Sequence, residues 1–286
     1  MGARRFTGWG MMVLLPLAFL HSGCGSDEGR GSSGEAARSV PRKALTQSLE
    51  AHQNTLTYNV INLGTWANRL RKMIEAENRK GAVASYLHVR AWLGRIEPTL
   101  AALPAVSRPL LSSDGDEGFP RIEQALQRGN LQQLQPLMKG FHRHMEDLRL
   151  EVEHAGLEPA QVPKLALGSL RSLSLANSTD LPNLAVIKAA ANLEGVRALF
   201  LAILPALEEY PALRKEMKRS LAGIFRTLGG MEGPGGDSRR SELGSPAILF
   251  QDFELRPERW EDSLRGRVAE LAGLFAETAR LRSDDE

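Results

Sequence analysis

Apolar residues recur along the first half of the chain at steps of three, four and seven, the spacing that places side chains on one face of an α-helix. A long first stripe is closed by Gly81, a second ends near Pro104, and a third helix is expected from Pro120 to Arg128. A fourth helix is expected after it. The apolar stripes of the first, second and fourth helices are, in that order, Leu45, Leu49, Leu56, Val60, Leu63, Leu70 and Ile74; Tyr86, Val89, Leu93, Ile96, Leu100 and Leu103; and Leu134, Leu137, Phe141, Leu148 and Val152.

The second half shows the same period. A Leu- and Ser-rich helix is expected over residues 163–176, and Asp180 with its neighbours provides a helix start. The helix that runs from there to Leu204 is apolar on nearly every side, which predicts a central, buried position. Two more stripes follow, around Met217 and around Leu271. The pattern predicts an all-α fold, a helical bundle in residues 42–284 with two bundle-like halves, 42–156 and 157–284.

Residues 1–23 have the pattern of a secretory leader. Arg4 and Arg5 are followed by an apolar stretch, Met11 to Leu20, that is too short to span a bilayer as a helix. Ser-Gly-Cys at its end is similar to a lipobox, which predicts that Cys24 is lipidated and becomes the new N-terminus. Residues 24–41 are small, polar and without period, as expected of a flexible tether.

Composition narrows the function classes. The chain has 286 residues, 42% hydrophobic and 24% charged, with a formal charge of +2 and one cysteine. Without a basic patch, nucleic acid is not an expected partner. A single cysteine excludes disulfides within the chain and cysteine-based metal clusters. No nucleophile motif, phosphate loop or zinc-protease pattern is present, which argues against an enzyme.

Three separated blocks resemble the imelysin-like family of bacterial envelope proteins, which includes the periplasmic lipoprotein of Efe-type iron-uptake systems. The second block is similar to that family's Gly-Phe-His-Arg-Ile-Glu signature, and the third to its Asp-Leu and Asn-x-x-Gly sequences. The blocks are Arg90 with Arg95-Ile96-Glu97-Pro98; Gly118-Phe119-Pro120-Arg121-Ile122-Glu123; and Asp180-Leu181 with Asn192-Leu193-Glu194-Gly195.

The resemblance implies a helical envelope protein, facing the periplasm, with a role in iron or other metal handling. It also locates a departure. Where the family signature has a metal-binding histidine, this chain has Pro120, which offers no side-chain lone pair. Glu123, expected in the first turn of its helix, and Glu97 are the acids that remain for a metal site. Two interpretations stay open for them: metal ligands, or a carboxylate favoured by the helix dipole and a polar pairing of Arg90 with Glu97.

His52 is the histidine best placed to compensate, because it falls within the first apolar stripe and should face the bundle interior. A core histidine with satisfied hydrogen bonds explains the same position. Three functions remain: a lipid-anchored binding protein accessory to iron or metal uptake, with a degenerate metal site; a helical scaffold lipoprotein that binds another envelope protein and needs no metal; and, least supported, a metal-dependent peptidase.

Overall fold

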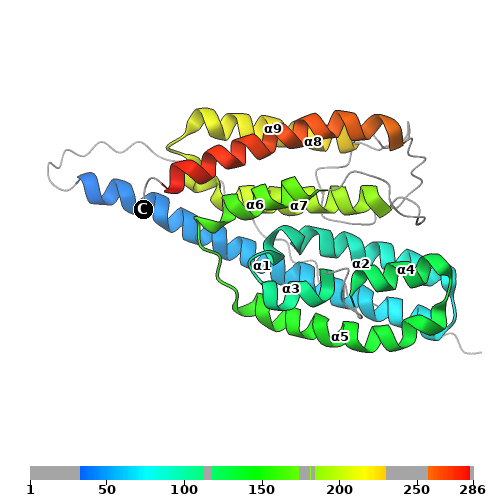
Figure 1. Ribbon diagram of the computed structural model, residues 1–286. Coiled ribbons are helices and arrows are strands. Elements are labelled where there is room, and N and C mark those ends of the chain that lie inside the picture. Colours follow the sequence, from blue (N-terminus) through cyan, green and yellow to red (C-terminus); the bar gives the residue numbers. More distant parts are fainter. Residues whose placement is uncertain (1–32, 112–117, 174–180, 182–183, 230–256, 284–286) are drawn as a thin grey trace, which may run out of the picture.

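The computed structural model describes residues 33–111, 118–173, 181, 184–229 and 257–283 (Figure 1). The predicted leader, Cys24, the first part of the predicted tether and Asp180 lie outside these ranges. Within them the chain is all-α, as the apolar period predicts.

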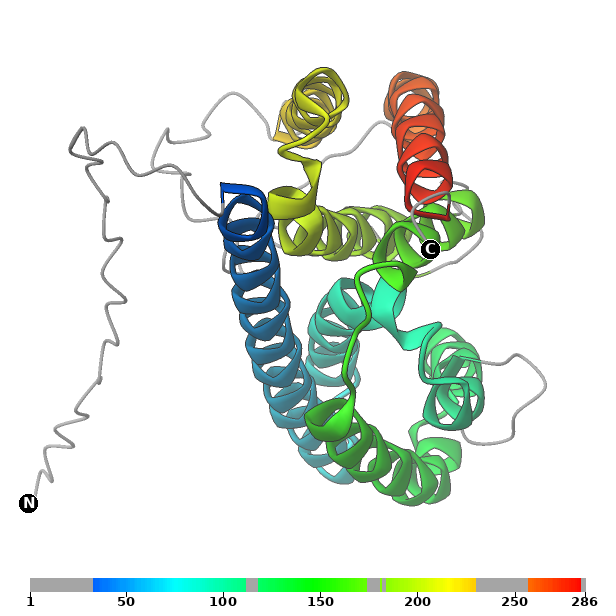
Figure 2. The same ribbon diagram turned by 90° about the vertical axis from the view of Figure 1, so that its left-hand side faces the viewer.

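Five helices make up the first part of the bundle (Figure 1). They are α1 (Ser33–Glu75), α2 (Arg79–Leu100), α3 (Pro104–Leu111), α4 (Phe119–Arg128) and α5 (Leu131–His154). Seen from the end of the bundle in Figure 2, α1 to α5 enclose a common interior. That interior holds a continuous apolar core, with Leu63, Tyr86 and Phe141 among its fully buried side chains.

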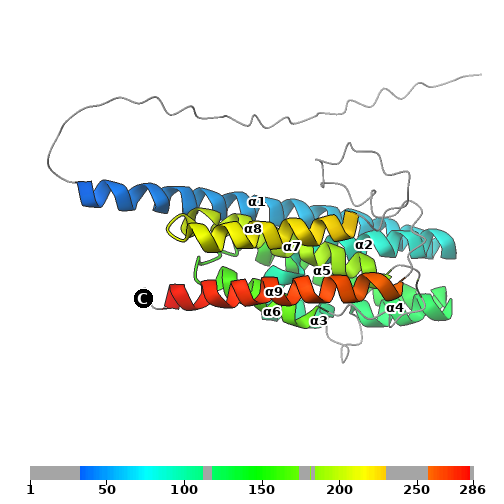
Figure 3. The same ribbon diagram turned by 90° about the horizontal axis from the view of Figure 1, so that it is seen from above.

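The remaining helices build a second core. They are α6 (Gln161–Ser172), α7 (Leu184–Ile203), the short 3-10 helix η1 (Leu204–Leu207), α8 (Pro211–Gly229) and α9 (Pro257–Ser283). Met217 of α8 and Phe275 of α9 are fully buried in this second core. Figure 3 shows that most of the helices run along one direction, so each core is a bundle with long shared interfaces.

Three helix boundaries differ from the sequence prediction. Helix α1 begins at Ser33, so the end of the predicted tether is helical; Glu35, Ala36 and Ala37 are good helix formers. Gly81 does not close the first helix but lies in the first turn of α2, whose N-cap Asn78 accepts a hydrogen bond from the Gly81 N–H at 2.9 Å. The residues that end the second stripe, around Leu103, form the connection to the short α3.

The two parts are joined by the close packing of α2 on α7. A side chain at Gly94 would meet Ala191 Cβ at 2.7 Å, and one at Gly195 would meet the carbonyl oxygen of Arg95 at 2.5 Å. These contacts are closer than Cβ atoms tolerate, so glycine at both positions lets the helix backbones approach. The Gly195 position of the third sequence block therefore has a packing explanation.

Helix α7 is buried on nearly every side, which confirms the prediction from its composition. In the described part of the chain, Leu184–Leu207 is the one helical stretch long and apolar enough to cross a membrane, and 61% of its apolar 18-residue segment is buried inside the protein. Burial of this kind is what a core helix requires, so the stretch gives only weak support for a membrane span.

Candidate functional site

A polar cavity of about 410 Å³ lies where α2, α4 and α7 meet, and we call it the α2–α4–α7 cavity. It brings together residues from all three sequence blocks. Its lining residues are Arg90, Glu97, Leu111, Phe119, Pro120, Glu123, Gln124, Gln127, Ser172, Leu173, Ala185, Lys188 and Asn192. Blocks that are about 100 residues apart in the sequence thus share one site.

Helix α4 presents one polar and one apolar face. Pro120, Glu123, Gln124 and Gln127 recur at steps of three and four and line the cavity. Phe119, Ile122, Ala125 and Leu126 lie on the other face and are buried in the first core. The amphipathic pattern therefore orients the cavity face of α4 without any contribution from a ligand.

The start of α4 differs from the prediction in two details. Gly118 is the N-cap in an extended conformation, and it is needed for space, because a Cβ there would meet the carbonyl oxygens of Pro109 and Leu110 at 2.7 and 2.8 Å. The helix begins at Phe119, which places Pro120 second and Glu123 beyond the first turn. The predicted stabilisation of Glu123 by the helix dipole was wrong for that reason, since the effect fades within the first turn.

Glu123 is instead held by a buried tyrosine of α2. The Tyr86 hydroxyl lies 3.1 Å from Glu123 Oε2 and 3.3 Å from the carbonyl oxygen of Phe119. Burial raises the pKa of Tyr86 well above its usual value; Arg90 opposes this shift and Glu123 adds to it. The tyrosine therefore stays a protonated donor that fixes the carboxylate at the cavity wall.

Arg90 is a buried cation in the cavity wall, with 5% of its surface exposed. Its guanidinium carbon lies 5.0 Å from the centre of the Phe119 ring, a cation–π contact. Its Nε has no hydrogen-bond partner within the described residues. Arg90 and Glu97 both line the cavity, but no ion pair joins them there, so the predicted polar pairing is not a direct contact.

Helix α7 adds two polar residues one turn apart, Lys188 and Asn192. Burial is the main cause that lowers the pKa of Lys188, and Arg90 adds to it, while Glu123 and Glu97 act in the opposite direction. Asn192 is buried, and its Oδ1 accepts a hydrogen bond from Ser169 Oγ at 2.8 Å. The amide oxygen is thus engaged by α6, which leaves the Asn192 NH₂ group as the donor for the cavity.

Lys188 is the residue that the motif comparison missed. The signal was nevertheless in the sequence: Lys188 is one of three charged residues, with Glu194 and Arg197, in a helix that is otherwise mostly apolar and buried. A charged side chain is rarely placed in a buried helix unless something pairs with it.

His52 lies elsewhere. It is 5% exposed, as predicted, but it is not among the residues that line the α2–α4–α7 cavity. Its Nε2 is 3.5 Å from Thr99 Oγ1, and its Nδ1 makes no hydrogen bond of normal geometry within the described residues. Burial lowers the pKa of His52 to about 4, although the backbone of Ala198 partly opposes this shift. A neutral core histidine fits this environment.

The donor set of the cavity does not fit a divalent metal held by protein groups alone. Glu97 and Glu123 are the two carboxylates that line it, Pro120 removes the histidine of the family signature, and Arg90 and Lys188 would repel a cation. Across the described ranges, no three His, Cys, Asp or Glu side chains are grouped closely enough to hold a metal ion.

Comparison with known proteins adds no assignment. No protein-family model matches this chain, and no curated protein is significantly similar to it. The resemblance to imelysin-like proteins therefore stays a prediction that rests on the three sequence blocks.

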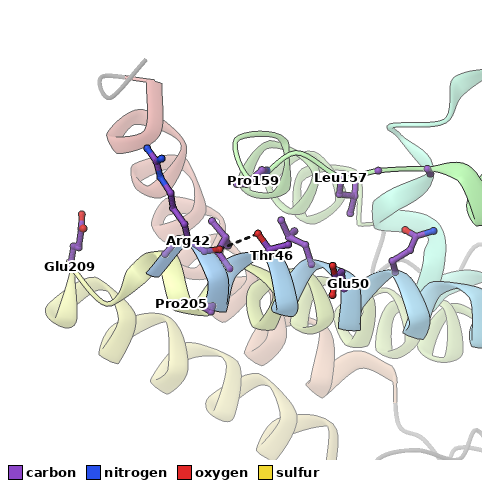
Figure 4. Close-up of a pocket in the computed structure, with 13 residues that line it drawn as sticks. Arg42, Thr46, Glu50, Leu157, Pro159, Pro205 and Glu209 are labelled. Carbon is purple, nitrogen blue, oxygen red and sulfur yellow. Dashed lines mark hydrogen bonds between the residues drawn. The ribbon is translucent and has the colours of Figure 1, made fainter. Parts of the chain in front are cut away.

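A larger hollow of about 980 Å³ lies beside the early part of α1, against the segment 155–159 and η1 (Figure 4). Leu45, Leu49 and Leu157 give it a partly apolar wall, and Thr46 Oγ1 bonds to the carbonyl oxygen of Arg42 at 3.1 Å within its own helix. Figure 4 shows Glu50 and Glu209 on separate parts of the wall. Because its charged groups do not converge, this hollow offers a ligand less than the α2–α4–α7 cavity does.

Proposed function

We propose that this protein is a non-catalytic ligand-binding protein of the bacterial envelope, lipid-anchored through Cys24, and that its ligand binds in the α2–α4–α7 cavity. The observation that carries the proposal is the convergence of Arg90, Glu97, Glu123 and Lys188 in one cavity. Charged groups placed around a concave site without direct ion-pair partners are characteristic of ligand recognition.

A binding role suits the chemistry of these groups better than catalysis does. Among the described residues that line the cavity, no nucleophile is hydrogen-bonded to a base, and the donor set provides too few ligands to activate a metal-bound water. The peptidase alternative therefore gains no support. A role in iron or metal uptake, which the resemblance implies, would require a metal whose other ligands come from outside this cavity.

The test is ligand-induced stabilisation of the purified full chain. A ligand present at 100 times its Kd should raise the free energy of unfolding by about 2.7 kcal/mol. Small polar solutes and Fe²⁺, Cu²⁺ and Zn²⁺ would be screened by thermal denaturation, and any shift should be reduced in Glu123→Gln and Lys188→Gln. Glu151→Gln, on the exposed face of α5, is the matched control. If no solute or metal shifts the transition, the proposal is wrong.

A second candidate, the scaffold lipoprotein that binds another envelope protein, is favoured by a different observation. Tyr58 and Ile61 are 58% and 54% exposed and lie three residues apart on α1, so they share a face. Trp66 continues along the same helix and stacks on His88 of α2, with ring centres 3.8 Å apart. A photocrosslinker at position 58 should capture one specific envelope protein in cells, whereas a crosslinker at position 151 should not.

A further inference from the structure

The α2–α4–α7 cavity holds two positive and two negative side chains that do not neutralise one another by contact. Arg90 and Lys188 are the cations, and Glu97 and Glu123 are the anions. None of the ion pairs in the described part of the chain involves any of the four. By contrast, Arg95 and Glu194, at the same α2–α7 interface, form a direct buried ion pair. The α2–α7 interface can thus hold a direct ion pair, but the four charged groups of the cavity do not form one.

Arg90 is the group with the strongest need for a partner. It is 5% exposed, its Nε is buried without a hydrogen bond within the described residues, and its guanidinium lies over the Phe119 ring. Buried donors without partners are costly, and a guanidinium presents its donors as a planar fork that matches two oxygens of one anionic group. Arg90 therefore indicates a carboxylate or a similar oxyanion on the ligand, and Lys188 adds a second positive charge.

The two carboxylates, Glu97 and Glu123, favour a cationic group on the ligand. The Tyr86 hydroxyl donates to one oxygen of Glu123, so the other oxygen stays available as an acceptor, and Glu97 makes no ion pair within the described residues. A ligand with an anionic group alone would bring a negative charge close to both acids. A ligand with a cationic group alone would approach Arg90 and Lys188. Because the two signs cancel across the cavity, a ligand that itself carries both signs loses least.

We propose that the α2–α4–α7 cavity binds a small zwitterion that carries one carboxylate and one ammonium group, as free α-amino acids and short peptides do. This inference rests on the proposed function. Arg90 and Lys188 hold the carboxylate, and Glu97 and Glu123 hold the ammonium group. A volume of about 410 Å³ is sufficient for a ligand of this size. Gln124 and Gln127 line the same wall and supply amide donors and acceptors for the rest of the ligand.

The test is isothermal titration of the full chain with defined probes: a mixture of the twenty α-amino acids, a mixture of di- and tripeptides, succinate, inorganic phosphate, 1,4-diaminobutane, and Zn²⁺. At least one zwitterionic mixture should release or take up heat on binding, and the two mixtures distinguish free amino acids from peptides. The component that binds should lose at least tenfold in affinity when its amine is acetylated or its carboxylate is amidated.

Variants locate the site. Lys188→Gln and Glu97→Gln should each weaken binding about tenfold, and Arg90→Gln should weaken it more. Lys164→Gln and Glu151→Gln, both at exposed positions, should leave it unchanged. If Arg90→Gln does not fold, Lys188→Gln and Glu97→Gln, at two partly buried positions, still show whether the ligand binds in the cavity. Thermal denaturation of each variant shows whether it is folded before titration.

The outcomes separate the two proposals. If neither mixture binds but succinate, phosphate, the diamine or Zn²⁺ binds and Lys188→Gln changes that binding, the zwitterion inference is overturned and the proposed function stands. If a zwitterion binds and its affinity is the same in Lys188→Gln, Glu97→Gln and Arg90→Gln, the site is elsewhere and the inference is also overturned. If no probe binds at all, both proposals fail.

Discussion

The Tyr86 hydroxyl donates a hydrogen bond to Glu123 Oε2 across a distance of 3.1 Å, linking the buried face of α2 to the cavity face of α4. The tyrosine is fully buried, whereas Glu123 reaches the cavity. A core side chain thus sets the position of a carboxylate at the candidate site, which couples the stability of the first core to the geometry of the cavity.

We expect Tyr86→Phe to lower the free energy of unfolding by about 1–2 kcal/mol, because it removes a hydrogen bond to a carboxylate while keeping the ring volume. In a protein of this size such a loss lowers Tm by roughly 2–4 °C. Tyr58→Phe is the control, since that residue is 58% exposed and its change should be within about 0.5 kcal/mol. Equal Tm values for wild type and Tyr86→Phe would contradict a structural role for the bond.

Two glycine substitutions should act in opposite directions. Gly195→Ala brings a Cβ to 2.5 Å from the Arg95 carbonyl oxygen and 2.8 Å from Pro98 Cγ, so α2 and α7 must separate. We expect a loss of about 1–3 kcal/mol. Gly168→Ala, inside α6, meets nothing within 4 Å and should gain about 0.5–1 kcal/mol from helix propensity. Urea unfolding of both variants measures the difference. A neutral Gly195→Ala would mean that the interface has room to adjust.

The burial of His52 predicts a pH dependence of stability. Its pKa of about 4 in the folded protein lies below the ordinary value of 6.5, so the folded state binds fewer protons. The associated stability is present above pH 6.5 and is lost as the pH falls toward 4. Between pH 7 and pH 5 we expect a loss of about 1–2 kcal/mol from this group. His52→Leu should remove that part of the slope in urea titrations at the two pH values.

Not all of the slope should disappear in His52→Leu. His88 is the second histidine whose pKa is lowered to about 4, by burial first and by Arg69 second, so it contributes in the same window. Identical slopes for wild type and His52→Leu would show that His52 is not buried as a neutral group.

The buried pair of Arg95 and Glu194 offers a test of the α2–α7 interface. Glu194→Gln removes the charge partner of an arginine that is 8% exposed, and we expect a loss of about 3–5 kcal/mol. Replacing both residues, as Arg95→Met with Glu194→Leu, should recover most of that loss, because no unpaired charge remains. Thermal denaturation of the single and double variants forms the cycle. If the double variant is as unstable as Glu194→Gln, the loss of stability comes from packing at the α2–α7 interface and not from an unpaired charge.

Much of the fold could be predicted from local pattern. The stripe around Leu63 and Leu70 predicted a helix and its buried face, the mostly apolar composition of α7 predicted a buried helix, and the expected end of the third helix at Arg128 is where α4 ends, before the C-cap Gly129. Gly129 has a φ of 71°, a conformation that glycine adopts without strain. The prediction was less accurate at boundaries, as at Gly81, because capping depends on which side-chain acceptor is nearby, here Asn78.

The candidate site could be predicted only in part. Arg90, Glu97, Glu123 and Asn192 do line one cavity, but His52 faces a different part of the interior and Lys188 was missed. A resemblance in short blocks identifies positions one at a time. It contains no information about a residue such as Lys188, which lies between the two matched parts of the third block and has no counterpart in the compared signature.

The sequence by itself determined which residues form helices and which face of each helix is apolar, because a period of 3.6 residues is a local property. Only the tertiary structure decided that the polar faces of α2, α4 and α7 meet, and that their two acids share a cavity with two cations. Periodicity sets the direction of a side chain about its own helix axis. The neighbour that it meets depends on contacts between distant segments, such as the close approach at Gly94 and Gly195.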